Sequence, residues 1–131
     1  MVKKISLTNV RHLASSYTSF NSLKTVLDEI HEECPNITRV YSIGNSVLGK
    51  PLWVISLGDR PTEHELGEPE VKLVATIHGN EPVGKELLLN FAWLLCENYG
   101  RHEFITLLLD HTQIHLLPVM NPDGFDIAVE G

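Results

Sequence analysis

Two residues that can bind a metal ion, His78 and Glu81, occur three positions apart in the segment ATIHGNEPVG. Imidazole nitrogen and carboxylate oxygen are both good zinc ligands, and a catalytic zinc site uses three protein ligands and one water. A tight turn can direct both side chains to one point, and Gly79 allows the backbone to pass close to an ion. The spacing predicts part of a zinc site. The alternative is a surface histidine followed by a helix-capping glutamate, since such pairs are frequent by chance.

The elements on either side of this pair support the metal interpretation. The apolar run Val71–Ile77 predicts a strand that is buried on both faces. Pro82 suits the first position of a helix that extends to about Tyr99, and Gly100 suits the left-handed residue after its end. Ligands of open α/β sheets bind at the carboxyl ends of strands, which is where this pattern places His78.

Alternating patterns continue along the rest of the chain and predict an α/β fold with a mixed sheet flanked by helices. A short turn joins two of the strands, which indicates an antiparallel hairpin. A chain of 131 residues is expected to form one domain. The further expected elements are a helix over Ser19–Cys34, strands over Thr38–Val47 and Leu52–Leu57, a helix over Glu103–Asp110 and a strand over Gln113–Met120.

Composition excludes some classes of partner and leaves others open. A formal net charge of -7 argues against nucleic acid, because such binding rests on cationic contacts to phosphate. No stretch is apolar for long enough to span a bilayer. The two cysteines, Cys34 and Cys96, do not make a disulfide framework, and their redox state stays open. The triplet beginning at Asn36 is a glycosylation sequon that a secreted protein could use.

The segments HGNEPVGKELLLNF and IHLLPVMNPDGF occur in this order and resemble the zinc metallocarboxypeptidases, in particular their regulatory branch of carboxypeptidases N, E, M and D. The segment YSIGNSVLGKPLWVISLG resembles the hairpin that precedes the zinc motif in that family. The resemblance implies that His78 and Glu81 are the first two zinc ligands. It also implies a structural turn that shapes the floor of the site, formed by Asn121, Pro122, Asp123 and Gly124.

The same resemblance implies an activity and a location. Such enzymes use Zn²⁺ to hydrolyse C-terminal residues, in this branch Arg or Lys, from peptides or proteins in the secretory pathway or outside the cell. Family members are longer, and beyond the Asn-Pro-Asp-Gly turn they supply the carboxylate-binding arginines, the third zinc ligand and the glutamate general base. Residues 1–131 are therefore expected to be the N-terminal part of one catalytic domain, to contain no catalytic residue and to be inactive alone.

Three other polar residues near these motifs are interpreted as structural. His115 lies in an apolar strand pattern and fits a histidine that faces the core or a neighbouring strand better than a third ligand. Lys85 is expected to be solvated on the first turn of its helix. Asp123 is expected to hydrogen-bond within its own turn.

Two other functions remain open at this stage. Zinc acylases such as aspartoacylase and succinylglutamate desuccinylase also carry an HGNE motif and would hydrolyse an N-acyl amino acid, although the hairpin and the MNPDGF segment favour the carboxypeptidases. The second alternative is a truncated, non-catalytic relative of these enzymes that has a binding role. The apolar strands also lead us to expect an open sheet edge through which the chain self-associates.

Overall fold

A computed structural model describes residues 17–129, which form a four-stranded mixed sheet with the order β1-β2-β4-β3. The β1–β2 and β2–β4 pairs are antiparallel, and the β3–β4 pair is parallel. The predicted α/β class with a mixed sheet and the predicted hairpin are both confirmed. The strands are β1 (Thr38–Asn45), β2 (Pro51–Leu57), β3 (Glu70–Val74) and β4 (Gln113–Leu117).

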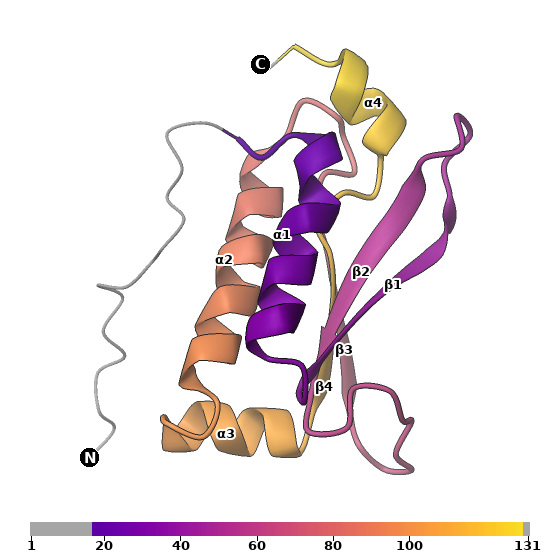
Figure 1. The fold of residues 1–131 in the computed structure, drawn as a ribbon. Helices are drawn as coiled ribbons and strands as arrows, with labels where there is room; N and C mark the ends of the chain where they lie inside the picture. The colour runs from indigo at the N-terminus through magenta and orange to yellow at the C-terminus, as the bar shows by residue number, and fades with distance from the viewer. Residues whose placement is uncertain (1–16, 130–131) are drawn as a thin grey trace.

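Two long helices lie side by side against one face of this sheet (Figure 1). The helix α1 (Phe20–Glu33) begins at Ser19, whose side chain accepts a hydrogen bond from the Ser22 amide at 3.1 Å and so satisfies a free helical N–H. The helix α2 (Val83–Asn98) packs beside it, and no helix among residues 17–129 is both long and apolar enough to cross a membrane. The core between helices and sheet includes Leu23, Leu27, Ile30, Ile55, Leu57, Leu89, Leu95 and Leu116.

Two short helices lie at opposite ends of the sheet. The helix α3 (Glu103–Asp110) crosses one end, and α4 (Pro122–Ile127) lies at the other end, where the β3–α2 loop and the hairpin tip are also found (Figure 1). Both lie close to their expected positions. The Asn-Pro-Asp-Gly segment opens α4 and does not form an isolated turn.

The strand β3 differs from its expected burial. All five of its residues are exposed, because β4 is its only neighbour among the described strands and β3 forms an edge of the sheet. Within the described residues 17–129, the expectation that this strand is buried on both faces is therefore wrong. An apolar run in the sequence predicts that a strand should be buried, but it does not show whether neighbouring elements pack against that strand. The exposed apolar residues here include Val71, Leu73, Val74, Ile77, Val83 and Leu87.

A disulfide joins Cys34, which follows the last residue of α1, to Cys96 near the end of α2. The two Cα atoms are 5.9 Å apart, although 62 positions separate the residues in the sequence. This bond settles the redox state that the sequence left open, and it fixes α1 against α2 at the end remote from α4 (Figure 1).

Candidate metal centre

The loop between β3 and α2 is built on an extension of the β3–β4 ladder. The Ala75 amide donates to the Leu117 carbonyl at 3.0 Å, and the Ala75 and Thr76 carbonyls accept from the amides of Met120 and Asn121, both at 3.0 Å. Thr76 then adopts a φ of 50°, which is uncommon for a residue with a side chain. The ladder ends at this point, and the chain is released into the turn that carries the predicted ligands.

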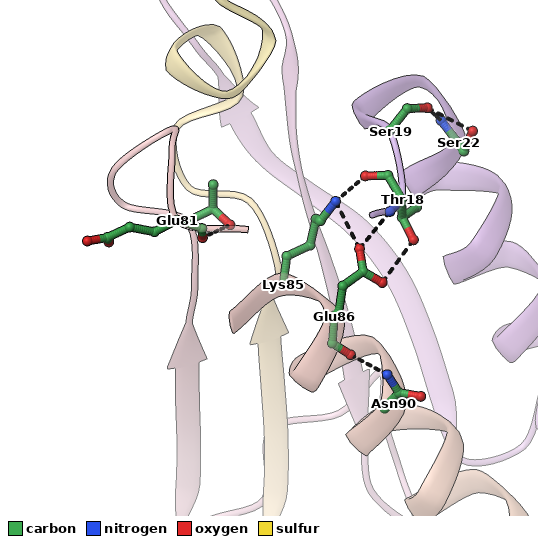
Figure 2. Close-up of polar contacts among 8 residues, drawn as sticks. Thr18, Ser19, Ser22, Glu81, Lys85, Glu86 and Asn90 are labelled. Carbon is green, nitrogen blue, oxygen red and sulfur yellow. Dashed lines mark hydrogen bonds and ion pairs between the residues drawn. The ribbon is translucent and has the colours of Figure 1, made fainter. Parts of the chain in front are cut away.

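His78 and Glu81 lie together in this turn, as their spacing predicted. Nδ1 of His78 is 3.2 Å from Oε2 of Glu81, and the Glu81 amide donates to the His78 carbonyl at 3.1 Å. Their side chains are 73% and 64% exposed, and the Glu81 carboxylate points away from the buried polar groups of α2 (Figure 2). A nitrogen and an oxygen donor at this separation can bind one Zn²⁺, so the residues present fit two positions of a zinc site.

The two sequence motifs are in direct contact through glycine. A Cβ atom placed on Gly79 would lie 2.6 Å from the Phe125 amide nitrogen and closer still to the Gly124 carbonyl group. Gly79 is therefore required by the close approach of the α4 backbone, a reason that the sequence does not reveal. The Asn121 side chain strengthens this contact, because it donates to the Ile77 carbonyl at 3.3 Å and accepts from the Gly124 amide at 2.9 Å.

Asp123 has partners other than those expected. Its carboxylate accepts from the Ser46 hydroxyl at 2.8 Å and from the Leu48 amide at 3.1 Å, both at the tip of the β1–β2 hairpin. The expectation of a bond within its own turn is wrong, because Asn121 already caps that turn and leaves Asp123 free to reach the hairpin. Lys50 adds an ion pair to Asp126, so the hairpin tip is fastened to α4.

Lys85 is fully buried, which contradicts the expectation of a solvated side chain. Its ammonium group donates to the Thr18 carbonyl and lies 3.0 Å from the Glu86 carboxylate (Figure 2). This burial could not be predicted from the local sequence, because the cover comes from residues 17–18 and from α4, which are distant along the chain.

No third ligand joins His78 and Glu81 among residues 17–129. Three carboxylates that lie close enough together to hold a metal ion are found elsewhere, in the loop at the opposite end of β3: Asp59, Glu65 and Glu68. His115 packs across the sheet, with Nδ1 2.8 Å from the Tyr41 hydroxyl, so its structural interpretation is confirmed.

The sequon residue Asn36 is exposed, in the turn between α1 and β1. This turn and the β3–α2 loop lie at opposite ends of the sheet (Figure 1). A glycan attached at Asn36 would therefore project from the end remote from His78.

A family model described as zinc carboxypeptidase matches residues 23–131. The chain belongs to the zinc carboxypeptidase family. It is 50% identical over 114 residues to carboxypeptidase E of Caenorhabditis elegans, and 48% identical over 110 residues to the human carboxypeptidase N catalytic chain. These matches cover 86% and 83% of this chain but 24% of each relative, so the chain spans about a quarter of the length of these relatives. The family match supports the carboxypeptidase prediction over the acylase alternative.

Solved structures show the same fold. The crystal structure of thrombin activatable fibrinolysis inhibitor is similar with a TM-score of 0.74 and 25% sequence identity, over 85% of this chain and 27% of that one. Carboxypeptidase A from Helicoverpa armigera is similar with a TM-score of 0.68 and 22% identity, over 93% of this chain and 29% of that one. The fold of residues 17–129 is therefore that of the zinc carboxypeptidases.

Proposed function

We propose that this chain supplies His78 and Glu81 as zinc ligands to a metallocarboxypeptidase that hydrolyses C-terminal residues from peptides or proteins. The observation that supports this best is the 3.2 Å approach of the His78 and Glu81 side chains in a loop at the carboxyl end of β3. When bound, zinc polarises the scissile carbonyl and lowers the pKa of its bound water towards about 7. The protein's own residues hold and orient these donors.

The loop and α4 act as the support of the site in this proposal. Gly79 rests on the backbone at Gly124, and Asn121 binds both the loop and the first turn of α4. Metal sites require ligands whose positions are fixed by surrounding contacts. No third ligand lies beside His78 and Glu81 among residues 17–129. We infer that the general base also comes from elsewhere and that the chain alone is inactive.

The substrate is proposed to be a peptide or protein C-terminus, with arginine or lysine as the released residue. The similarity to carboxypeptidase E and to the carboxypeptidase N catalytic chain supports this class of substrate. The formal net charge of -7 is compatible with cationic peptide ends. Zinc is the proposed cofactor, and nucleic acid is not a proposed partner.

The secretory pathway or the extracellular space is the proposed location. The Cys34–Cys96 disulfide supports it, because such bonds persist in oxidising compartments. We also propose a glycan on the exposed sequon residue Asn36.

Self-association through the β3 edge is the last part of the proposal. Val71, Leu73 and Val74 are exposed along an edge strand, and such edges pair with other chains. Light scattering and binding of a hydrophobic dye test this. A monomer with little dye binding would show that the edge is tolerated in water.

Zinc titration of the purified chain tests the assignment of the ligands. We expect affinity weaker than that of a three-ligand site, lost in His78→Ala and in Glu81→Ala and retained in the control His111→Ala, which changes an exposed histidine elsewhere. Equal binding by wild type and His78→Ala would overturn the assignment. Nanomolar affinity that His78→Ala abolishes would instead show a third ligand within the chain.

A peptidase assay tests the inactivity of the chain alone. Peptides ending in arginine should not be cleaved, and an N-acyl amino acid serves as the comparison for acylase activity. Chelator-sensitive release of a C-terminal residue would contradict the proposal that a general base must come from elsewhere.

A further inference from the structure

Lys85 occupies a position that ordinarily disfavours a buried lysine. It lies in the first turn of α2, four residues after Glu81, with none of its surface exposed. The N-terminal end of a helix repels positive charge, and a lysine is almost never fully buried unless it is paired. Burial lowers the pKa of its ammonium group, and the neighbouring Glu86 carboxylate opposes that shift. Such a residue requires a compensating role.

Lys85 and Glu86 together hold every backbone and side-chain polar group of Thr18 (Figure 2). The Lys85 ammonium donates to the Thr18 carbonyl. The Glu86 carboxylate accepts from the Thr18 amide at 2.7 Å and from its hydroxyl at 3.0 Å. The segment before α1 is therefore fastened to the first turn of α2.

The other side of the Lys85 ammonium faces α4. Its nitrogen lies 4.4 Å from the centre of the Phe125 ring, within the range of a cation–π interaction. The Phe125 amide donates to the Asn121 carbonyl at 3.0 Å, so the ring is attached to the first turn of α4. The same amide nitrogen is one of the three backbone atoms that a Cβ atom on Gly79 would meet, together with the carbonyl carbon and oxygen of Gly124. One buried cation thus connects the start of α2 with the backbone that supports the middle of the β3–α2 loop.

We propose that Lys85 is a positioning residue for the zinc loop: by holding Phe125 and the first turn of α2, it fixes the α4 backbone under Gly79 and thereby the orientation of His78 and Glu81. The inference rests on the proposed function, because it assigns Lys85 to the support of that same site. It does not make Lys85 a ligand, since its ammonium group points away from Glu81 (Figure 2). A role confined to fastening residues 17–18 is the competing outcome.

The test compares Lys85→Met, Lys85→Arg and the control Ile105→Ala in the full chain. Ile105 is a core residue of α3, at the end of the sheet remote from the loop (Figure 1). Two quantities are measured under conditions where each variant is folded. They are the NMR amide shifts of Gly79 and Glu81 without metal, and the zinc dissociation constant.

Lys85→Met should displace both amide resonances and weaken zinc binding by about tenfold or more, as loss of a supporting partner typically does. Lys85→Arg should restore much of both, because it keeps the charge and the donors. Ile105→Ala should lower the free energy of unfolding and change neither quantity. If Lys85→Met lowers the free energy of unfolding but changes neither the amide shifts nor the zinc dissociation constant, as expected for Ile105→Ala, the positioning role is wrong.

A second variant keeps the test valid if Lys85→Met does not fold. Phe125→Leu retains an apolar side chain but removes the aromatic face, and it should move the Gly79 amide in the same direction by a smaller amount. An unchanged Gly79 amide in Phe125→Leu would overturn the proposed connection. If the wild-type chain binds no zinc at all, the proposed function fails, whereas the metal-free resonances still decide whether Lys85 positions the loop.

Discussion

Two acid–base pairs lie within nine residues at the start of α2, and their surroundings are opposite. His78 and Glu81 are 3.2 Å apart and mostly exposed, whereas Lys85 and Glu86 are 3.0 Å apart and 0% and 19% exposed. An exposed pair contributes about 0–1 kcal/mol to the free energy of folding, so little stability is lost when its two side chains bind a metal ion and no longer contact each other. A buried pair is costly to break and is suited to hold elements in place. The exposed pair is thus available to bind an ion, and the buried pair a few residues later supports the elements around it.

The buried pair also has a counterpart at the other end of the two long helices. Thr18 is fastened to α2 by Lys85 and Glu86, and Cys34 is fastened to it by the disulfide with Cys96. The segment around α1 is therefore attached to α2 at both ends.

Reduction of the Cys34–Cys96 disulfide should have the largest effect. A cross-link between residues 62 positions apart restricts the unfolded chain, and the chain-entropy model gives about 4 kcal/mol at 25 °C. Urea unfolding with and without reductant measures this. A loss below about 1 kcal/mol would show that the polar attachment at Thr18 and the core hold α1 without the covalent bond.

Glu86→Leu should cost about 3 kcal/mol, because it leaves the Lys85 ammonium buried without its carboxylate and removes two acceptors from Thr18. The double variant Lys85→Met with Glu86→Leu should recover much of that loss, since no unpaired charge remains. Glu81→Leu is the matched control on the exposed pair and should change the free energy of unfolding by about 0.5 kcal/mol or less. Equal losses in Glu86→Leu and Glu81→Leu would remove the distinction between the pairs.

The same contrast explains which parts of the site could be predicted from the sequence. His78 and Glu81 were found because ligand chemistry requires particular residue types at a short spacing, and both stand in one turn. The bounds of α1 followed from apolar periodicity, and those of α2 followed from Pro82 and Gly100 at its two ends. Both signals are local in the chain.

The features that could not be predicted depend on contacts between distant segments. Burial of Lys85 requires Thr18 and Phe125, and Asp123 binds a hairpin tip 75 to 77 positions away. A first-turn lysine and a turn aspartate each have an ordinary local interpretation, and only the folded chain excludes it. The disulfide was missed for the same reason, because two cysteines alone do not specify a pairing.

The polar groups on the sheet provide a prediction about pH. Burial lowers the pKa of His115 below its ordinary value of 6.5. The Glu70 carboxylate opposes this shift, and the Lys72 ammonium adds to it. The Tyr41 hydroxyl forms a hydrogen bond with Nδ1 of the same ring. The folded state therefore disfavours the protonated ring, and stability should fall as the pH drops below about 6.5 towards the lowered pKa. His115→Gln should flatten this part of the profile in urea unfolding. An unchanged slope would assign it to another histidine.

Glu70 contributes in a separate and lower window. A hydrogen bond with His64 lowers the pKa of this carboxyl group, with further lowering from His115 and Lys72. Its contribution is present above the ordinary pKa of 4.5 and is lost as the pH falls through the lowered value. Glu70→Gln should therefore alter the profile below about pH 4.5. Because Glu70 opposes the lowering of the His115 pKa, the same substitution should also extend the loss of stability due to His115 to lower pH. A change confined to the region above pH 5 would contradict this assignment.

His78→Ala should have the smallest effect on the metal-free protein, about 0.5 kcal/mol or less, because it removes an exposed side chain whose polar contact within residues 17–129 is the one with Glu81. The same substitution should abolish the stabilisation that added zinc gives to the wild-type chain, since a ligand that binds only the folded state raises its free energy of unfolding. Urea unfolding with and without zinc measures both quantities on one pair of proteins. A loss above about 2 kcal/mol without metal would mean that His78 supports the loop and is not simply held by it. The division between an exposed binding pair and a buried supporting pair would then be wrong.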